Sequence, residues 1–290
     1  MLHITRTLEI STMPLTYEST AQSPTTTDGL HYHVAGDGPN LIMLHGSGPG
    51  VSGWSNFANN LPVFAEHFRT YIFDMPGFGV SPTQEWTRPY PEHAAEALIR
   101  AMDDLGIDKA HVIGNSMGGW VTLTAALLAP ERFDRLALMG PGGLYAEVFG
   151  PPQSEGAKRL FGYVANPSRE AMISWVESMV HDPAMITDEL IDQRLAMAEA
   201  PGAIERMRSI LGSLGNPTDQ APLLQRLAQL QHQSLVIWGR DDRMLPLEGA
   251  FFGTRRMPRA DLLVLSDCGH WAQVERKHDF EQSCIDFFTR

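Results

Sequence analysis

The pentapeptide Gly114-Asn-Ser-Met-Gly118 constrains the fold of this chain more than any other segment. It follows a short apolar run and precedes a helix-forming run from Trp120 to Leu128. Glycines two positions either side of Ser116 let a strand turn sharply into a helix, which exposes the serine hydroxyl at the helix N-terminus. The pattern is typical of a nucleophile elbow, whereas the pentapeptide alone would also suit a surface turn.

Short apolar runs alternate with amphipathic segments along most of the chain. The expected strands are residues 41–44, 70–73, 110–113, 136–139, 235–238 and 262–265. The expected helices are residues 57–67, 91–105, 117–129, 247–256 and 275–288. This alternation predicts an α/β fold with a mostly parallel, twisted sheet flanked by helices.

One stretch breaks the alternation. Residues 143–230 contain helical segments such as 169–180 and 188–197, separated by prolines, and no convincing strand. The stretch is too long for a loop, so we expect a helical cap, or lid, over the carboxyl ends of the strands, where ligands of such sheets bind. A second helical domain that packs elsewhere is the alternative.

The expected organisation therefore has three parts. Residues 1–28 are rich in Thr and Ser and are expected to form a flexible N-terminal leader. Residues 29–142 and 231–290 are expected to form the core domain, and residues 143–230 the cap.

Composition excludes several classes of function. The formal net charge of -12 leaves no basic surface for nucleic acid, and an anionic substrate would need a local cation. The two cysteines, Cys268 and Cys284, show no metal-ligand spacing, so we expect no disulfide, metal or cofactor, and a cytoplasmic location. No apolar run is long enough to cross a membrane.

A serine nucleophile needs a base and a carboxylate that orients the base. Asp241 and Asp242 follow the strand at 235–238, and His270 follows the strand at 262–265. The chain order Ser, Asp, His is the one associated with α/β-hydrolases, so Ser116 and His270 are the expected nucleophile and base. Asp242 is preferred because Asp242-x-x-Leu-Pro resembles the acid loop of that superfamily; Asp241 is the alternative.

A reacting carbonyl also needs two backbone N–H groups for its negative charge. Met117, directly after the nucleophile at a helix N-terminus, is expected to give one. Ser47, in the loop after the strand at 41–44, is expected to give the other. Residues 48–53 of that loop also match Gly-x-Gly-x-x-Gly, with Asp74 after the next strand, as in a dinucleotide site. Pro49 lacks an N–H for a phosphate, which counts against that alternative.

Six motifs cover the candidate site: His45-Gly-Ser-Gly-Pro-Gly50, Gly53-Trp-Ser-Asn56, Gly114-Asn-Ser-Met-Gly-Gly119, Met139-Gly-Pro-Gly-Gly143, Trp238-Gly-Arg-Asp-Asp-Arg243 and Cys268-Gly-His-Trp-Ala272. Together they resemble the meta-cleavage product hydrolases, carbon–carbon bond hydrolases of bacterial aromatic degradation. The resemblance covers residues 28–290. It implies the α/β-hydrolase fold, a Ser116–Asp242–His270 triad, a small anionic dienoate substrate, no cofactor, and a homodimer or larger homo-oligomer.

The substrates of that family are 2-hydroxy-6-oxohexa-2,4-dienoates, which water cleaves to 2-hydroxypentadienoate and a carboxylic acid. The resemblance implies that Arg194, on a cap helix, binds the dienoate carboxylate with Asn56 and Asn115. It also implies ketonisation of the dienolate with His270 as proton carrier, followed by attack on the C6 carbonyl. An acyl-enzyme route is favoured over an activated water, and both stay open.

The remaining expected substrate contacts are Trp271, Gly142 and an apolar subsite for the C6 group, formed by Leu160, Trp175, Met179, Met244 and Leu245. A bulky, aryl C6 group is favoured. Trp120 replaces the small residue expected after Gly119, as a packing residue or as one that reshapes the subsite. A general carboxylesterase of this fold and a non-catalytic ligand-binding relative are the alternatives.

Overall fold

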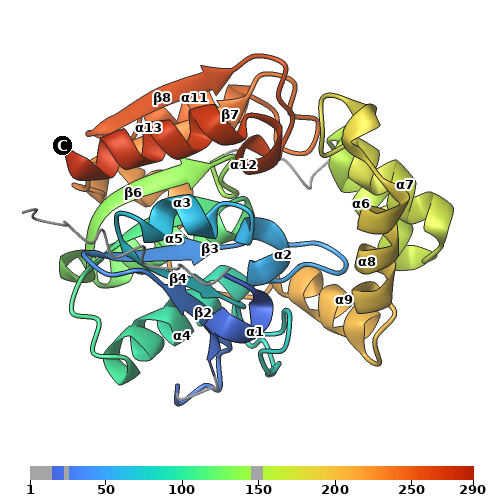
Figure 1. The fold of residues 1–290 in the computed structure, drawn as a ribbon, viewed down its shortest axis with the longest axis horizontal. Helices are drawn as coiled ribbons and strands as arrows, with labels where there is room; N and C mark the ends of the chain where they lie inside the picture. Colours follow the sequence, from blue (N-terminus) through green and yellow to red (C-terminus); the bar gives the residue numbers. More distant parts are fainter. Residues whose placement is uncertain (1–14, 23–25, 145–152) are drawn as a thin grey trace, which may run out of the picture.

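The computed structural model describes residues 15–22, 26–144 and 153–290 (Figure 1). Its centre is an eight-stranded sheet in the order β1-β2-β4-β3-β5-β6-β7-β8. The strands are β1 (Ala21–Gln22), β2 (Tyr32–Ala35), β3 (Asn40–Leu44), β4 (Arg69–Phe73), β5 (Ala110–Asn115), β6 (Phe133–Met139), β7 (Ser234–Gly239) and β8 (Ala260–Leu265). Strands β3 to β8 pair in parallel, and β2 is antiparallel to both β1 and β4. All six expected strands are therefore present, and the α/β-hydrolase fold is confirmed.

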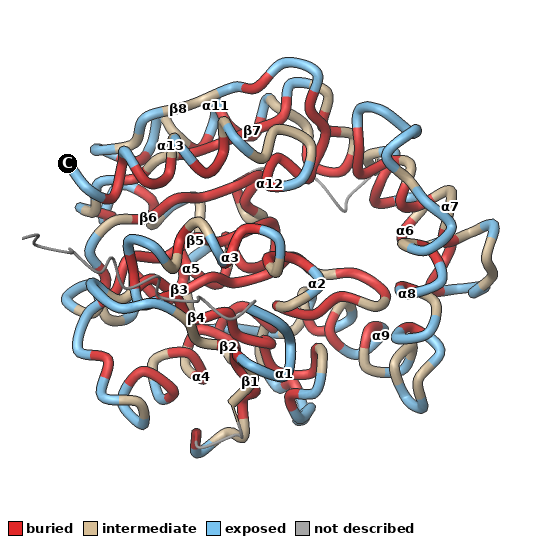
Figure 2. Tube along the Cα trace, in the orientation of Figure 1, coloured by how far each residue is buried: buried red, intermediate tan, exposed pale blue. Residues whose placement is uncertain are grey.

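Alternate residues of the central strands belong to opposite faces of the sheet. In β3, Leu41 and Met43 join one hydrophobic cluster, whereas Ile42 and Leu44 join the other. All six residues of β5 are buried. Figure 2 shows the buried residues concentrated along these strands, with exposed residues on the outer sides of the helices. Burial on both faces explains why the strands appear in the sequence as continuous apolar runs.

Helices of the core cover both faces of the sheet. They are α2 (Gly53–Phe57), α3 (Leu61–Ala65), α4 (Tyr90–Asp104), α5 (Met117–Leu128), the 3₁₀ turn η1 (Pro130–Arg132), α11 (Glu248–Thr254), α12 (Ala272–Glu275) and α13 (Lys277–Thr289). Apolar residues of α4 and α5 join one cluster, and those of α3 and α13 join the other. The single helix expected at 57–67 is instead two short helices, because Asn60 begins a new helix with Pro62 in its first turn.

Only helices and turns lie among the described residues between β6 and β7. They are α6 (Glu155–Ala165), α7 (Arg169–Glu177), η2 (Pro183–Met185), α8 (Asp188–Ala198), α9 (Ala203–Ser213), α10 (Leu223–Arg226) and η3 (Leu227–Gln229). Figure 1 shows α6 to α9 grouped on the side toward which β3 and β6 point. We call this group the helical insert. Residues 145–152 of the expected cap lie outside the described residues, and the division into core and cap stays a prediction.

The expected flexible leader is wrong for residues 15–22. Thr16 and Ser19 form a capping box that begins α1 (Tyr17–Thr20), and β1 then pairs with β2. The Tyr17 ring lies edge-on to Trp54, with 5.6 Å between ring centroids. These contacts attach the segment to the sheet, because a capped turn and a packed aromatic ring offset the entropy of ordering it. Residues 1–14 and 23–25 lie outside the described part of the chain.

No helix in the described residues is long and apolar enough to cross a lipid bilayer.

Candidate active site

Ser116 lies at a strained turn between β5 and α5. Its backbone has φ 52° and ψ −113°, a conformation that is rare for a residue with a side chain. The turn is tight: a Cβ on Gly114 would lie 2.5 Å from the Thr122 hydroxyl, and one on Gly118 would overlap the Leu44 carbonyl. Both glycines are therefore required by the geometry, as the nucleophile-elbow interpretation predicts.

His270 and Asp242 are in contact beneath the surface. The His270 Nδ1 atom lies 2.7 Å from Asp242 Oδ2, and both side chains are about 1% exposed. The other carboxylate oxygen of Asp242 accepts hydrogen bonds from the N–H groups of Met244 and Leu245, each 2.8 Å long. Asp241 instead pairs with Arg240 and His181 nearer the surface. Of the two acids considered, Asp242 is thus the one that contacts the histidine.

This contact orients the imidazole ring. An Nδ1–H donated to a carboxylate leaves Nε2 as the acceptor nitrogen, and His270 Nε2 is buried without a hydrogen-bond partner in the described part of the protein. Gly140, with φ 45°, lies against the ring: a Cβ there would be 3.2 Å from Nδ1. The arrangement can supply a base nitrogen held by a buried carboxylate.

The loop after β3 lies against the elbow. A Cβ on Gly46 would be 3.3 Å from the Ser116 Cβ and 2.7 Å from the Asn115 side-chain oxygen. His45 holds this loop through Nδ1, which lies 2.6 Å from the Gly46 carbonyl, and through Nε2, which accepts the Met75 N–H. The structure thus brings the loop that contains Ser47 next to the turn that contains Met117.

The glycines of the same loop do not form a phosphate cradle. A Cβ on Gly48 would overlap the Trp175 ring, and one on Gly50 would overlap the backbone carbonyl of Arg194. The N–H of Gly53 donates to Asp74, whose carboxylate is buried. Trp175 and the Arg194 backbone fill the space above these glycines, and the Gly53 N–H already has a partner. The loop therefore cannot bind the phosphates of a dinucleotide, which excludes that alternative.

Arg194, on α8, is a buried cation without an acidic partner in the described part of the chain. The residue is 5% exposed, and its guanidinium lies 4.9 Å from the ring centroid of Trp271 and 5.7 Å from that of Trp175. The hydrogen bond that it donates to the Pro49 carbonyl is 3.5 Å long. Burial lowers the pKa of Arg194 to about 10, so the group is still charged at neutral pH. A buried charge of this kind is stabilised by a bound anion.

The two asparagines expected beside this arginine are also buried. The side-chain oxygen of Asn56, on α2, has no hydrogen-bond partner in the described residues. The Asn115 amide donates to the Met139 carbonyl at 3.3 Å. An unpartnered buried amide oxygen can accept a hydrogen bond from a hydroxyl group of a ligand.

A family model described as the alpha/beta hydrolase fold matches residues 39–277. The solved 2-hydroxy-6-oxo-6-phenylhexa-2,4-dienoate hydrolase of Rhodococcus sp. strain RHA1 superposes with a TM-score of 0.83 at 33% identity, covering 93% of this chain and all of that one (100%). The meta-cleavage product hydrolase of Pseudomonas fluorescens gives 0.82 at 31% identity, with 94% and 98% coverage. A Burkholderia cepacia 2-hydroxy-6-oxo-6-phenylhexa-2,4-dienoate hydrolase is 41% identical over 262 residues, 90% of this chain and 91% of that protein. The chain belongs to the meta-cleavage product hydrolases.

In this meta-cleavage product hydrolase, four of the five residues expected around the C6 group adjoin the loops described above. The Met244 and Leu245 N–H groups bind Asp242, and the Met179 carbonyl accepts the His270 N–H at 2.7 Å. Trp175 lies against the loop at Gly48. Leu160 is fully buried on α6.

Gly142 and Trp120 lie together behind the elbow. The Gly142 N–H donates to the Ser116 carbonyl at 2.8 Å, and a Cβ on Gly142 would be 3.3 Å from the Trp120 ring. The same ring lies near Gly143, where a Cβ would approach it to 3.1 Å. These contacts favour Trp120 as a packing residue of the hydrolase.

Three structural contributors were not expected from the sequence. Gly140 lies against the imidazole, Arg243 donates to backbone carbonyls of the insert, and Glu275 accepts hydrogen bonds from the loop that contains His270. Arg243 and Glu275 bond backbone groups, which carry no side-chain pattern, and Gly140 lies against the ring of a histidine that is distant in sequence. No local sequence signal could therefore have revealed them.

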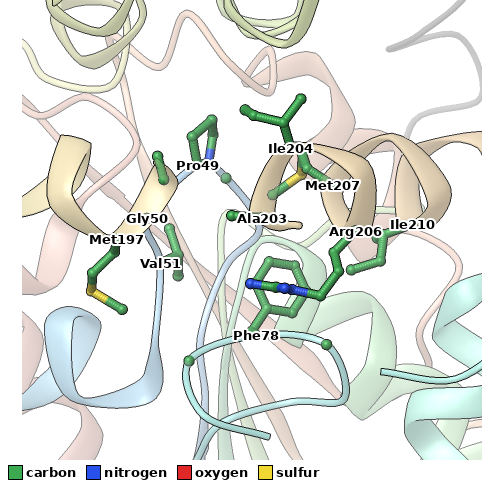
Figure 3. Close-up of a pocket in the computed structure, with 14 residues that line it drawn as sticks. Pro49, Gly50, Val51, Phe78, Met197, Ala203, Ile204, Arg206, Met207 and Ile210 are labelled. Carbon is green, nitrogen blue, oxygen red and sulfur yellow. The ribbon is translucent and has the colours of Figure 1, made fainter. Parts of the chain in front are cut away.

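A small cavity of about 40 Å³ lies between the insert and the core of the hydrolase. Figure 3 shows side chains from the loop at Pro49 to Val51, from α8 and from α9 gathered around it. Its lining is mostly apolar, with Arg206 as the charged member. A cavity of this size holds only a few water molecules, so it is too small for a dienoate.

Proposed function

We propose that this enzyme hydrolyses the C5–C6 bond of a 2-hydroxy-6-oxohexa-2,4-dienoate that carries an aryl group on C6. The products would be 2-hydroxypenta-2,4-dienoate and an aromatic carboxylic acid. The observation that carries the proposal is the buried guanidinium of Arg194, which has no acidic partner among the described residues, in the same molecule as a strained serine and a buried His270–Asp242 pair. A general esterase has no need for such a buried cation.

In this proposal Arg194 binds the dienoate carboxylate. Support comes from the lack of an acidic partner in the part of the chain that the structure describes, and from the flat rings of Trp175 and Trp271, which lie against the guanidinium. Asn56 and Asn115 would bind the oxygens next to the carboxylate, and Trp271 would contact the dienoate chain. A planar guanidinium suits a carboxylate because two parallel hydrogen bonds can form.

The first chemical stage would be ketonisation. The proton of the 2-hydroxyl group of the dienol is removed, which gives a dienolate, and a proton is then added at C5, which leaves a C2 ketone. His270 would carry the proton, because its Nε2 has no hydrogen-bond partner among the described residues and its Nδ1 is held by Asp242. The ketone provides an electron sink for the C5–C6 bond that breaks later.

The second stage would be hydrolysis. The Ser116 oxygen adds to the C6 carbonyl and gives its proton to His270, while the N–H groups of Ser47 and Met117 stabilise the oxyanion. The C5–C6 bond then breaks, its electrons pass into the dienolate, and the proton from His270 neutralises the product. Water hydrolyses the remaining ester of Ser116 and releases the acid.

The C6 group would occupy the apolar side of the site. The residues assigned there are uncharged and at most 5% exposed: Leu160, Trp175, Met179, Met244 and Leu245. The names of two similar curated proteins differ in the C6 group. The Burkholderia cepacia protein is named for a C6-phenyl dienoate. A Comamonas testosteroni protein, 39% identical over 262 residues, is named for oxononadienedioate and oxononatrienedioate. An uncharged lining favours phenyl, because a second carboxylate would be buried without a cation.

We further propose that the helical insert is a cap over the site, and that the enzyme is a cytoplasmic homo-oligomer. The cap is supported by the contacts of Trp175 and Arg194 with the loop after β3. Both cysteines are buried free thiols, which suits a reducing compartment. Light scattering coupled to size exclusion tests the oligomer.

Steady-state kinetics with 2-hydroxy-6-oxo-6-phenylhexa-2,4-dienoate test the function. We expect loss of the visible absorbance of the dienoate, with kcat/KM for the C6-phenyl substrate at least about tenfold above that for a C6-carboxyethyl analogue. Turnover of simple aryl esters without turnover of the dienoate would favour a carboxylesterase. Saturable binding without products would favour a ligand-binding relative.

A further inference from the structure

The carboxylate of Glu275, the last residue of α12, bonds the loop that contains His270. Its Oε1 accepts the Gly269 N–H at 2.9 Å and the Trp271 N–H at 3.3 Å, on either side of the histidine. Its Oε2 accepts the His181 N–H, from the helical insert, at 2.6 Å. One side chain therefore connects two segments that are far apart in sequence.

The middle N–H of the loop is bonded to the insert as well. His270 N–H donates to the Met179 carbonyl at 2.7 Å. Three consecutive N–H groups, 269 to 271, thus have partners outside their own loop, two of them on Glu275. Gly269 permits the approach, because a Cβ there would lie 2.8 Å from the Met179 carbonyl oxygen and 2.9 Å from the His181 nitrogen. We call residues 177–181 the bridging segment.

The bridging segment is also bonded to the loop that contains Asp242. Arg243 donates to the carbonyls of Glu177 and Val180, the latter at 3.1 Å. His181 Nδ1 lies 3.0 Å from Asp241 Oδ2. Both loops of the candidate triad are therefore held by one stretch of the insert, and Glu275 bonds that stretch and the histidine loop at once.

We propose that Glu275 is a positioning residue for His270: its carboxylate fixes the 269–271 loop against the bridging segment and so keeps the imidazole aligned between Asp242 and Ser116. The inference rests on the proposed role of His270 as base. Glu275 acts through the backbone and does not touch substrate. The effect on rate is large for a small displacement, because proton transfer requires the ring nitrogen within hydrogen-bond distance of the serine hydroxyl.

Glu275 also adds negative charge near His270. Burial raises the pKa of Glu275, and the nearby carboxylate of Asp242 raises it further. The three N–H bonds that Glu275 accepts act in the opposite direction. The other titratable or charged groups around it are His181, Asp241, Cys268, His270 and Arg276.

Two substitutions of Glu275 change the charge and the length of its side chain separately. Glu275→Gln keeps the size of the side chain but loses its charge. Because the NH₂ group of glutamine cannot accept a hydrogen bond, the variant loses either the His181 bond or the Gly269 and Trp271 bonds. Glu275→Asp keeps the charge but is one methylene too short to reach both segments. Asp279→Asn is the matched control, because Asp279, on α13, pairs with Arg276 and is partly exposed. Each variant is assayed on the phenyl dienoate and on a neutral aryl ester, with near-UV circular dichroism as the measure of folded protein.

We expect both Glu275 variants to lose at least about tenfold in kcat, with KM within about threefold, on both substrates. The control should match the wild type in all measurements.

The proposal is overturned if kcat of both variants stays within about twofold of wild type, or if activity falls only in proportion to the folded fraction. If Glu275→Gln does not fold, Glu275→Asp decides by the same comparison of kcat and KM. A wild type that hydrolyses the ester but not the dienoate contradicts the proposed function, yet the ester series still tests Glu275.

Discussion

Two buried charged groups of the candidate site differ in how their charges are stabilised. Asp242 has an imidazole N–H and two backbone N–H groups, so its charge is stabilised before any substrate arrives. Arg194 has two aromatic rings and one long hydrogen bond, so its charge is poorly stabilised in the free enzyme. The first arrangement suits permanent catalytic machinery, and the second suits a group that a substrate completes.

Substitution of the proposed nucleophile or base should abolish most turnover. We expect Ser116→Ala and His270→Ala each to lower kcat on the phenyl dienoate by at least about a thousandfold, because the two groups act as one unit. Stopped-flow and steady-state absorbance measure the loss. His278→Ala, at an exposed histidine, is the control. Turnover within tenfold of wild type in either variant would refute its assignment.

Removal of the buried guanidinium should affect anionic substrates selectively. We expect Arg194→Ala to raise KM for the dienoate by about tenfold or more and to slow ketonisation, because the carboxylate loses its partner. Neutral aryl esters should be turned over at rates close to wild type. Arg255→Ala, at the exposed end of α11, controls for loss of a positive charge. An equal loss on both substrates would remove the carboxylate role.

At the scale of elements, contacts between backbones decide how the insert meets the core. Gly50, with φ +67°, leaves no room for a Cβ against the carbonyl of Arg194 on α8. Gly156 on α6 also lies close to the acid loop, where a Cβ would be 2.8 Å from the Met244 Cα. The position of the guanidinium is thus set by a glycine in a loop of the core.

A methyl group at position 50 should therefore displace α8. We expect Gly50→Ala to raise KM for the dienoate several-fold while leaving kcat on neutral esters within about threefold, because the elbow and His270 do not contact this glycine. Gly106→Ala is a matched control, since Gly106 has φ +65° and open space around its Cα. Comparable changes in both variants would show backbone strain alone, and no effect at Gly50 would contradict the close contact.

Most elements could be predicted from the sequence because buried parallel strands appear as apolar runs. The order of these strands then placed Ser116, the acids and His270 at the same end of the sheet. Strands β1 and β2 were not predicted, because they are short and contain polar residues such as Gln22 and His33. The contacts of the bridging segment with the catalytic loops were not predicted for another reason: most of them use backbone carbonyl and N–H groups, which every residue has.

Across the whole molecule, Asp74 joins three parts of the chain. Its carboxylate accepts the Gly53 N–H at 2.7 Å and the Val80 N–H at 3.2 Å, and it lies 3.0 Å from His31 Nδ1. Burial alone would raise the pKa of Asp74, but the His31 contact, nearby His45 and the two N–H bonds lower it. The residue before β2, the start of α2 and the loop after β4 are therefore joined by one ionised group.

Neutralising this carboxylate should destabilise the protein. We expect Asp74→Asn to lower the free energy of unfolding at pH 7 by about 3 kcal/mol, measured by urea denaturation. Because the folded pKa is depressed, the stabilisation is complete above the ordinary carboxylate pKa near about 4 and is lost as pH falls through the lower, folded value. The difference between wild type and variant should shrink at that acidic end.

Asp286→Asn provides the comparison, since Asp286 is exposed on α13 and should change stability by less than about 0.5 kcal/mol. A loss at Asp74 that does not depend on pH would argue against the ionised form as the source of stability.

Strands β6 and β7 are hydrogen-bonded neighbours, although the whole helical insert separates them in sequence. The sheet would close in the same register without the insert, so the insert resembles an exchangeable module from the viewpoint of topology. The catalytic loops impose a condition on any such exchange. A chimaera that receives a foreign insert must also receive a stretch equivalent to residues 177–181. Otherwise the loop that contains His270 will lack the hydrogen-bond partners that this stretch supplies.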